Sequence, residues 1–210
     1  MSLYTGPLVR QYAGSPRVIV EGGTCNGEDT LEMLSAYSPD RIITFEANPE
    51  NLRECQAKLG SIDKIQLVGQ ALSDVTGSIQ FFPGDRAKCQ FPNGGISSMF
   101  PFEPGHENFV LQAPVTVPCT RLDDFLTSIQ VPKVDMLCLD IQGAELLALR
   151  GMGRYLADVK VVVCEVWSTP YYRGTPRMQE VISWMATNGF GHRDLIQYAD
   201  YGDLLFYRRT

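Results

Sequence analysis

The sequence predicts a doubly wound α/β fold with a mostly parallel sheet, and two observations carry this prediction. Four short apolar runs are rich in β-branched residues and lack strict alternation, which is typical of strands covered by helices on both faces. Helical segments separate these runs along the 210-residue chain. Each run ends in a carboxylate: Glu21, Glu46, Asp140 and Glu165. Because ligands bind outside the carboxyl ends of parallel strands, we expect these acids to surround a cationic or hydroxyl-rich ligand.

The composition favours one compact domain over residues 1–210. A hydrophobic content of 44% at this length is enough for a full core. The net charge of -6, without any block of basic residues, argues against a nucleic-acid partner. The apolar runs are too short to cross a bilayer, and residues 1–16 lack a signal-peptide core, so we expect a cytoplasmic protein without a membrane span.

The cysteines and histidines do not form a metal-binding pattern. Cys138 and Cys164 fall inside expected strands, and none of the six cysteines forms a C-x-x-C pair, so we expect free thiols. His106 and His192 each lack a second ligand at zinc-site spacing. A structural zinc site is therefore not expected.

Three strands and two helices are expected in the first third of the chain. Gly22 and Gly23 open the turn into the first helix, for which Asn26 is the expected N-cap. Asn48 and Pro49 give the second helix an N-cap and a proline at its first position. The expected strands are 18–21, 42–46 and 65–68, and the expected helices are 27–37 and 49–59.

The rest of the chain continues the alternation and ends in an antiparallel pair of strands. Weak alternation predicts a strand or hairpin arm at 78–82, and a Gly/Pro-rich stretch without helical periodicity follows at 83–114. We interpret this stretch as an insertion that forms part of a substrate pocket. The other expected strands are 115–118, 136–140, 161–165, 191–196 and 203–207, and the other expected helices are 120–129, 143–150 and 177–188.

The turn Glu21-Gly22-Gly23-Thr24-Cys25-Asn26-Gly27 lets the backbone and a helix N-terminus approach a ligand closely. A dinucleotide fingerprint needs a middle glycine where this chain has Thr24 or Cys25. The acids at and just after this turn, Glu21, Glu28 and Asp29, would repel a pyrophosphate but suit an ammonium or sulfonium group. S-adenosylmethionine carries both of these groups.

Glu46 ends the next strand, where a carboxylate can accept hydrogen bonds from the two ribose hydroxyls of a nucleoside. This feature alone does not separate S-adenosylmethionine from a dinucleotide. The alternative for Glu21 and Glu46 is that they cap neighbouring helices.

Eight short motifs follow one another along the chain: VEGGTCNGEDT (20–30), FEANPEN (45–51), QALSD (70–74), GISS (95–98), RLDDF (121–125), LDIQGAE (139–145), CEV (164–166) and DLLFYRR (203–209). In this order they resemble the FkbM-type methyltransferases, a class I S-adenosylmethionine-dependent family. The resemblance runs from about residue 18 to residue 209. It implies a seven-stranded Rossmann-like sheet with an antiparallel last strand, S-adenosylmethionine as cofactor and S-adenosylhomocysteine as product.

The resemblance also implies roles for individual residues. The methionine part of the cofactor would be held by Glu21, Gly22, Gly23 and Thr24, the ribose by Glu46, and the adenine by Ala71, Leu72 and Ser73. Asn26 and Ala47 complete the expected cofactor-binding set, and Asp140 would lie beside the reacting methyl group. Three positions depart from the family pattern: Glu21 where Asp is usual, Cys25 where Asn is frequent, and Gln142 where Glu is usual.

Methyl transfer to a hydroxyl needs a group that takes the hydroxyl proton while the acceptor oxygen, methyl carbon and sulfur stay in line. Asp140 and Glu165 are the expected bases, with His106 of the insertion in reserve. Alternatively, Asp140 serves only the cofactor's ammonium group, and Glu165 caps a backbone group or pairs with an arginine such as Arg173. A divalent ion held by Asp140, Glu145 and Glu165 would also suit carboxylate chemistry, but we expect no metal.

Aromatic residues follow Glu165 and recur in the insertion, and flat apolar faces beside polar groups suit a sugar or another polyol. The alternative is that these rings only pack loops onto the sheet. The expected substrate-binding residues are Ser97, Ser98, Gln142, Glu145, Trp167 and Tyr172, of which the two serines come from the family resemblance.

These features lead to the hypothesis of an O-methyltransferase that acts on a hydroxyl of a sugar or glycan. Known members of the family methylate sugar and natural-product hydroxyls, which agrees with this hypothesis. The alternatives are a non-sugar natural-product hydroxyl or amine as acceptor, a nucleotide-dependent oxidoreductase, and a cofactor-binding module without turnover. The sequence does not identify the acceptor or the oligomeric state.

Overall fold

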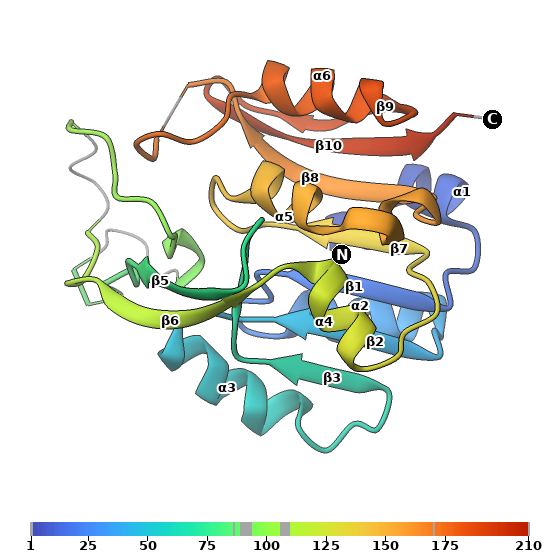
Figure 1. Ribbon diagram of the computed structural model, residues 1–210, viewed down its shortest axis with the longest axis horizontal. Coiled ribbons are helices and arrows are strands. Elements are labelled where there is room, and N and C mark those ends of the chain that lie inside the picture. The colour runs from blue at the N-terminus through green and yellow to red at the C-terminus, as the bar shows by residue number, and fades with distance from the viewer. Residues whose placement is uncertain (1, 86, 89–93, 106–109, 170, 210) are drawn as a thin grey trace.

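A seven-stranded sheet forms the centre of the computed structural model, which describes residues 2–85, 87–88, 94–105, 110–169 and 171–209 (Figure 1). The strand order is β3-β2-β1-β7-β8-β10-β9, and β10 runs antiparallel to β8 and β9 while the other pairs are parallel. The predicted mostly parallel α/β sheet with an antiparallel final pair is therefore confirmed. The strands are β1 (Val18–Gly22), β2 (Arg41–Phe45), β3 (Ile65–Val68), β7 (Met136–Leu139), β8 (Val161–Trp167), β9 (Phe190–Gln197) and β10 (Tyr201–Arg208).

A smaller sheet lies beyond the carboxyl ends of the parallel strands, at the left of Figure 1. Its strands follow the order β4 (Ala71–Leu72), β6 (Val115–Thr120) and β5 (Gly77–Phe81). The strands expected at 78–82 and 115–118 correspond to β5 and β6. β4 was not predicted, because two residues are too few to show a periodic pattern.

The insertion between β5 and β6 is tied to the rest of the fold by isolated bridges in its described parts. Phe82 pairs with Ser98, and Phe102 pairs with Tyr172 of the segment after β8. A short 3₁₀ helix, η2 (Gly94–Ile96), lies between these bridges. The second bridge brings the insertion beside the carboxyl end of β8.

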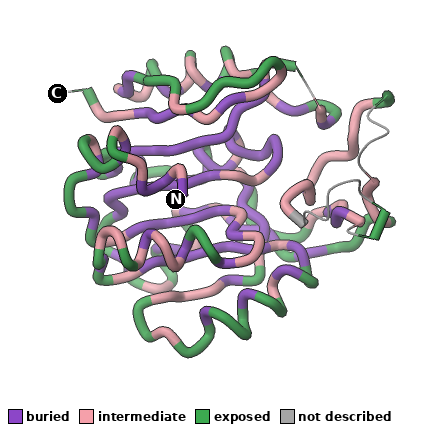
Figure 2. The backbone as a smooth tube through the Cα atoms, turned by 180° about the vertical axis from the view of Figure 1, so that it is seen from behind, coloured by how far each residue is buried: buried purple, intermediate pink, exposed green. Residues whose placement is uncertain are grey.

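Helices cover both faces of the main sheet because successive strand residues point to opposite faces and both faces are apolar. Ile19 and Ile42 belong to the core under η1, α1 and α2, whereas Val20 and Ile43 belong to the core under α4, α5 and α6. Figure 2 shows the central strands buried along most of their length. The helices are η1 (Leu3–Thr5), α1 (Pro7–Ala13), α2 (Glu28–Tyr37), α3 (Pro49–Leu59), α4 (Leu122–Ser128), α5 (Glu145–Gly151), η3 (Gly153–Ala157) and α6 (Met178–Thr187).

The predicted start of α3 is confirmed, but that of α2 needs a correction. The Asn48 side chain accepts a hydrogen bond from Glu50 N, and Pro49 is the first helical residue. In α2 the N-cap is Gly27 rather than Asn26, since Gly27 takes a left-handed conformation with φ 80°. Asn26 Oδ1 still accepts a hydrogen bond from Glu28 N at 3.0 Å, so its side chain supports the same turn from one residue earlier.

The five cysteines in the described part of the chain are free thiols, as expected. Within the same ranges, none of the helices combines the length and the apolar character that a membrane crossing requires. The cytoplasmic location stays a prediction.

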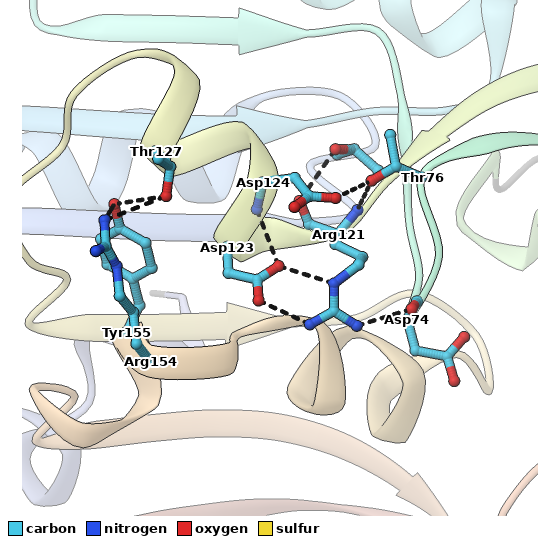
Figure 3. Close-up of polar contacts among 9 residues, drawn as sticks. Asp74, Thr76, Arg121, Asp123, Asp124, Thr127, Arg154 and Tyr155 are labelled. Carbon is cyan, nitrogen blue, oxygen red and sulfur yellow. Dashed lines mark hydrogen bonds and ion pairs between the residues drawn. The ribbon is translucent and has the colours of Figure 1, made fainter.

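Arg121, which begins the RLDDF motif, joins the small sheet to α4 (Figure 3). Its guanidinium donates two hydrogen bonds to the Asp123 carboxylate, at 2.9 and 2.7 Å, and one to the backbone oxygen of Asp74 at 2.9 Å. Its backbone N donates to Thr76 Oγ1, which in turn donates to Asp124 Oδ2 at 2.6 Å. This motif therefore stabilises the fold and does not line a ligand cavity described below.

Replacing Arg121 should destabilise the protein without disturbing the sheet edge. Arg121→Met removes charge-assisted hydrogen bonds, so the free energy of unfolding should fall by about 2–3 kcal/mol in urea denaturation followed by circular dichroism. Arg53→Met is the matched control, because Arg53 is exposed and donates to Pro49 O within its own helix. Equal changes for the two variants would contradict this role of Arg121.

Candidate active site

The first cavity opens at the carboxyl ends of β1, β2 and β7, with a volume of about 500 Å³ counted out to open solvent. Phe45, Phe81 and Met99 supply apolar surface, and Asn51 and Gln70 supply polar groups. Six of the residues predicted to bind the cofactor line this cavity: Gly23, Glu46, Ala47, Ala71, Leu72 and Asp140. The predicted substrate residue Ser97 also lines it.

Glu46 is fixed in the wall of the first cavity by backbone donors. Its Oε2 accepts a hydrogen bond from Cys25 N and its Oε1 accepts one from Asn48 N, both at 2.8 Å. Burial raises the pKa of Glu46 to about 7, against the effect of these hydrogen bonds. The Asn51 side chain is a third hydrogen-bond partner of this carboxylate, which is thereby fixed in the cavity wall as an acceptor.

Gly23 is required by the close approach of two turns. It has φ 85°, and a Cβ atom built on it would lie 1.8 Å from the backbone oxygen of Asp140. Gly23 N also donates to Phe45 O at 2.9 Å, and Asp140 N donates to Gly22 O at 3.0 Å. The ends of β1, β2 and β7 therefore meet at this glycine, which lines the first cavity.

Glu21 and Thr24 do not line either cavity, although both were predicted to bind the cofactor. Glu21 points to the sheet face covered by α2, where its Oε2 accepts hydrogen bonds from Thr30 and Thr44. Thr24 Oγ1 lies 2.7 Å from Thr30 Oγ1 in the same buried network. Burial raises the pKa of Glu21 to about 7, and its Oε1 has no partner among the described residues. The structure thus places this acid under the glycine turn, and direct contact with a ligand stays a prediction.

The second cavity adjoins the first, because Cys25, Gly95 and Asp140 line both. Its volume is about 1000 Å³ counted out to open solvent. The predicted bases Asp140 and Glu165 and the predicted substrate residues Gln142, Trp167 and Tyr172 line it.

Aromatic rings from three parts of the chain meet in the wall of the second cavity. The centroid of Trp167 lies 4.9 Å from that of Tyr201 and 5.0 Å from that of Tyr171, and the centroids of Phe102 and Tyr172 lie 4.9 Å apart. These rings pack against one another as well as line the cavity, so the sequence-based alternative of loop packing also holds in part. Trp167 belongs to β8, which runs two residues beyond the predicted strand end at Glu165.

Two carboxyl groups, those of Asp140 and Glu165, line the second cavity without a cation among the residues that line it, and a third, that of Asp203, belongs to the neighbouring strand. Burial raises the pKa of Asp140 to about 6. Burial is the main cause that raises the pKa of Glu165 well above its ordinary value, and repulsion from Asp140 is the second. Asp203 is paired with Glu165 across β10 and β8, and burial raises its pKa to about 6. Arg173, the predicted alternative partner of Glu165, lies instead 3.9 Å from Glu103.

Several predicted site residues lie outside both cavities and hold the surrounding turns. Glu145 Oε1 accepts hydrogen bonds from the backbone N of Ile141 and Gly143, and Ser98 Oγ donates to Gln142 O. The other residues outside the cavities are Gly22, Asn26 and Ser73. His106 lies outside the described residues, so its role as a reserve base stays a prediction.

Other lining residues were missed by the sequence-based prediction. Gln70 stands at the start of the QALSD motif and lines the first cavity, and Tyr201 of β10 lines the second. Asp203 of β10 lines neither cavity but lies beside Glu165 in the sheet. The signal for the last two was the expected antiparallel final pair, since Tyr201 is the register partner of Trp167 and Asp203 that of Glu165.

The family model described as the methyltransferase FkbM domain matches residues 21–192, which is more than half of the chain. The chain belongs to the FkbM methyltransferase family. It is therefore an S-adenosylmethionine-dependent methyltransferase, and S-adenosylmethionine is its methyl donor.

Relatives and solved structures agree with this assignment. This FkbM methyltransferase is 24% identical over 169 residues to the 2-O-methyltransferase NoeI of Sinorhizobium fredii, and the match covers 79% of this chain and 69% of NoeI. Its fold is similar to that of Sp1610 from Streptococcus pneumoniae in complex with S-adenosyl-L-methionine, with a TM-score of 0.53, 13% identity, and 100% and 75% of the two chains covered. An rRNA methylase from Streptococcus thermophilus gives a TM-score of 0.51 and 8% identity over 98% of each chain. At these identities the two structures show the class I methyltransferase fold alone.

The first cavity of this FkbM methyltransferase fits the donor. Glu46 would offer fixed acceptors to the ribose hydroxyls, and Leu72 belongs to an apolar surface on which a flat base would lie. Asp140 supplies a negative charge where the two cavities meet. Within the described ranges, no group of three His, Cys, Asp or Glu side chains is arranged to hold a metal ion.

The Glu46 carboxylate should contribute strongly to donor binding. We expect Glu46→Ala to weaken the affinity for S-adenosylhomocysteine by about tenfold to a hundredfold, because hydrogen bonds to a charged group are lost. Isothermal titration calorimetry measures this change. Glu50→Ala, on the exposed first turn of α3, is the control. Wild-type affinity in a folded Glu46→Ala protein would refute the assignment of the first cavity.

The buried Glu21 should make the folded state less stable as the pH rises. Its pKa is raised from 4.5 to about 7, so the stabilisation of the neutral carboxyl is complete below pH 4.5 and is lost as the pH passes 7. The loss from this group amounts to roughly 3 kcal/mol. Glu21→Gln should therefore be more stable than the parent at pH 8 and should show a weaker decline of thermal stability between pH 5 and pH 8. The exposed Glu28→Gln serves as control, and a parent-like decline in Glu21→Gln would exclude this effect.

Proposed function

We propose that this FkbM methyltransferase transfers the methyl group to a hydroxyl of a sugar or glycan. The observation that carries the proposal is the second cavity, where aromatic rings surround carboxyl groups beside the donor cavity. Sugar rings present C–H faces that stack on aromatic side chains and hydroxyl edges that bond to carboxylates. The name of the relative NoeI, a 2-O-methyltransferase, supports an oxygen acceptor.

The charge of the cavities argues against a nucleic-acid acceptor. None of the described residues that line the two cavities is a lysine, an arginine or a histidine. A phosphate group would instead meet Asp140, Glu165 and the net charge of -6 of the whole chain. The likeness to an rRNA methylase concerns the fold, and a shared fold does not transfer the substrate.

The insertion at 83–114 contributes to the acceptor pocket in this proposal. Gly95, Ile96 and Phe102 line the second cavity, and the bridge from Phe102 to Tyr172 connects the insertion to the aromatic segment after β8. The acceptor is thereby enclosed between the insertion and the carboxyl end of β8.

When bound, the donor supplies an electrophilic methyl carbon on a positively charged sulfur. The acceptor oxygen forms a bond to this carbon, the carbon–sulfur bond breaks, and its electron pair stays on sulfur, which becomes neutral. The hydroxyl proton passes to a carboxylate oxygen of Asp140 or Glu165, both of which line the acceptor cavity. The protein's main contribution is to hold the acceptor in line, which is worth up to about 7–11 kcal/mol in ideal cases.

An amine acceptor is the second candidate, because aromatic faces with nearby carboxylates also hold cations. The cation-free acid cluster of Asp140, Glu165 and Asp203 is the specific observation that favours it. The product distinguishes the two candidates, because a hydroxyl acceptor gives an oxygen–methyl bond and an amine acceptor gives a nitrogen–methyl bond.

Labelled S-adenosylmethionine and a panel of neutral glycosides, amino glycosides and short RNAs test the proposal directly. We expect label on a sugar hydroxyl, located by mass spectrometry, and no label on RNA. Label on nitrogen in the amino glycosides would favour the second candidate. Transfer to RNA alone would refute a sugar acceptor.

Asp140→Asn should separate binding from turnover. Loss of a proton acceptor costs about a hundredfold or more in kcat. The affinity for S-adenosylhomocysteine should change less than about tenfold, because the amide keeps the shape of the wall. Asp194→Asn, on the exposed side of β9, is the control. Turnover at the parental rate would exclude Asp140 as a base.

A further inference from the structure

Gln142 connects the two predicted bases through one side-chain amide. Its Nε2 donates hydrogen bonds to Asp140 Oδ1 at 2.6 Å and to Glu165 Oε1 at 2.8 Å, so both amide hydrogens are used. Asp140 follows the end of β7, whereas Glu165 lies within β8. One neutral group therefore bridges two acids that would otherwise only repel each other.

The hydroxyl of Tyr172 fixes which way the Gln142 amide points, because it contacts the amide oxygen Oε1. Tyr172 Oη lies 2.8 Å from Gln142 Oε1 and 2.9 Å from Ile96 O, so the hydroxyl is held between two acceptors. Reversing the amide would place Oε1 against two carboxyl groups and its hydrogens against the tyrosine. The backbone oxygen of Gln142 is also held, since Ser98 Oγ donates to it at 2.7 Å.

The backbone adopts an uncommon conformation at this position. Gln142 has φ 53°, in the left-handed region, and the next residue, Gly143, has φ 101°. A residue other than glycine is strained in this region and persists there where the surroundings hold it in place. Here Ser98 and Tyr172 hold the turn and direct the side chain between the acids.

The amide of Gln142 contacts only one oxygen of each acid. Its two hydrogen bonds end on Asp140 Oδ1 and Glu165 Oε1, and both acids line the second cavity. We propose that Gln142 is a positioning residue that holds Asp140 and Glu165 together, so that their remaining oxygens face the acceptor and one of them takes its proton. This inference rests on the proposed function. A glutamate at this position could not donate both hydrogen bonds, so the bridge requires the amide.

The groups that face the pair share its negative sign or are neutral. They are Asp29 of α2, Glu145 of α5, Cys164 of β8, Tyr201 and Asp203 of β10, and Tyr172. Because none of these groups is a cation, the two amide hydrogens of Gln142 are the contacts that favour ionisation of the pair.

Gln142→Met and Gln142→Glu test the inference through the pH profile. Gln142→Met removes both hydrogen bonds, and Gln142→Glu replaces a donor by a third acid, so both should move the acidic limb of kcat/KM upward by about one pH unit. At pH 7 we expect kcat to fall about tenfold or more while KM for the acceptor stays within about threefold. The affinity for S-adenosylhomocysteine should stay parental, which also shows that the variants fold. Gln179→Glu adds the same charge on the exposed side of α6 and is the control.

A pH titration of the protein without any acceptor tests the role of Gln142 independently of which substrate is methylated. Carboxyl-carbon NMR of the apo protein should show the Asp140 and Glu165 titrations shifted to higher pH in Gln142→Met. If this shift occurs but no glycoside is methylated, the positioning role of Gln142 is supported and the proposal of a sugar acceptor is wrong. If both variants keep the parental pH profile and the parental carboxyl titrations, the positioning role of Gln142 is overturned.

Discussion

The contact between the backbone of Gly23 and the backbone oxygen of Asp140 joins the ends of the strands on which both cavities depend. A side chain at position 23 would start 1.8 Å from that oxygen, so only a glycine allows the two turns to meet. Gly23 N also reaches Phe45 O, which brings in the strand that leads to Glu46. One close approach thus sets the distance between Glu46, which lines the first cavity, and Asp140, which lines both cavities.

The acids at this sheet edge lie in three different environments. Glu46 receives backbone hydrogen bonds, Asp140 and Glu165 share the amide of Gln142, and Glu21 lies beneath the turn among threonine hydroxyls. All four have raised pKa values, because burial outweighs these contacts and no cation faces them within the described residues. A cationic donor suits this arrangement, since it would supply the missing positive charge where the cavities meet.

Most of the fold and several of the residues that line the first cavity could be predicted from the sequence. Strand and helix periods, the Asn48-Pro49 start of α3 and the glycine turn are local patterns, and they place Gly23, Glu46 and Asp140 at the correct sheet edge. The direction in which a side chain at the end of a strand points cannot be predicted from the neighbouring residues alone. Glu21 and Glu46 both end apolar runs, yet the register of the sheet turns the first toward α2 and leaves the second in the cavity. Likewise, the carboxylate of Glu145 accepts hydrogen bonds from backbone groups of the preceding turn, which its place in the sequence did not indicate, and its contact with substrate stays a prediction.

The sequence alone determined the α/β class, the family and the carboxyl ends of the strands as the place of chemistry, because these depend on periodicity, on glycines and on motifs of neighbouring residues. Only the tertiary structure decided which acids share a cavity, that Asp203 is paired with Glu165, and that Gln142 bridges Asp140 and Glu165. These relations join residues from β7, β8 and β10 with an insertion that has no periodic pattern. They arise from strand order and packing, which no short stretch of sequence contains.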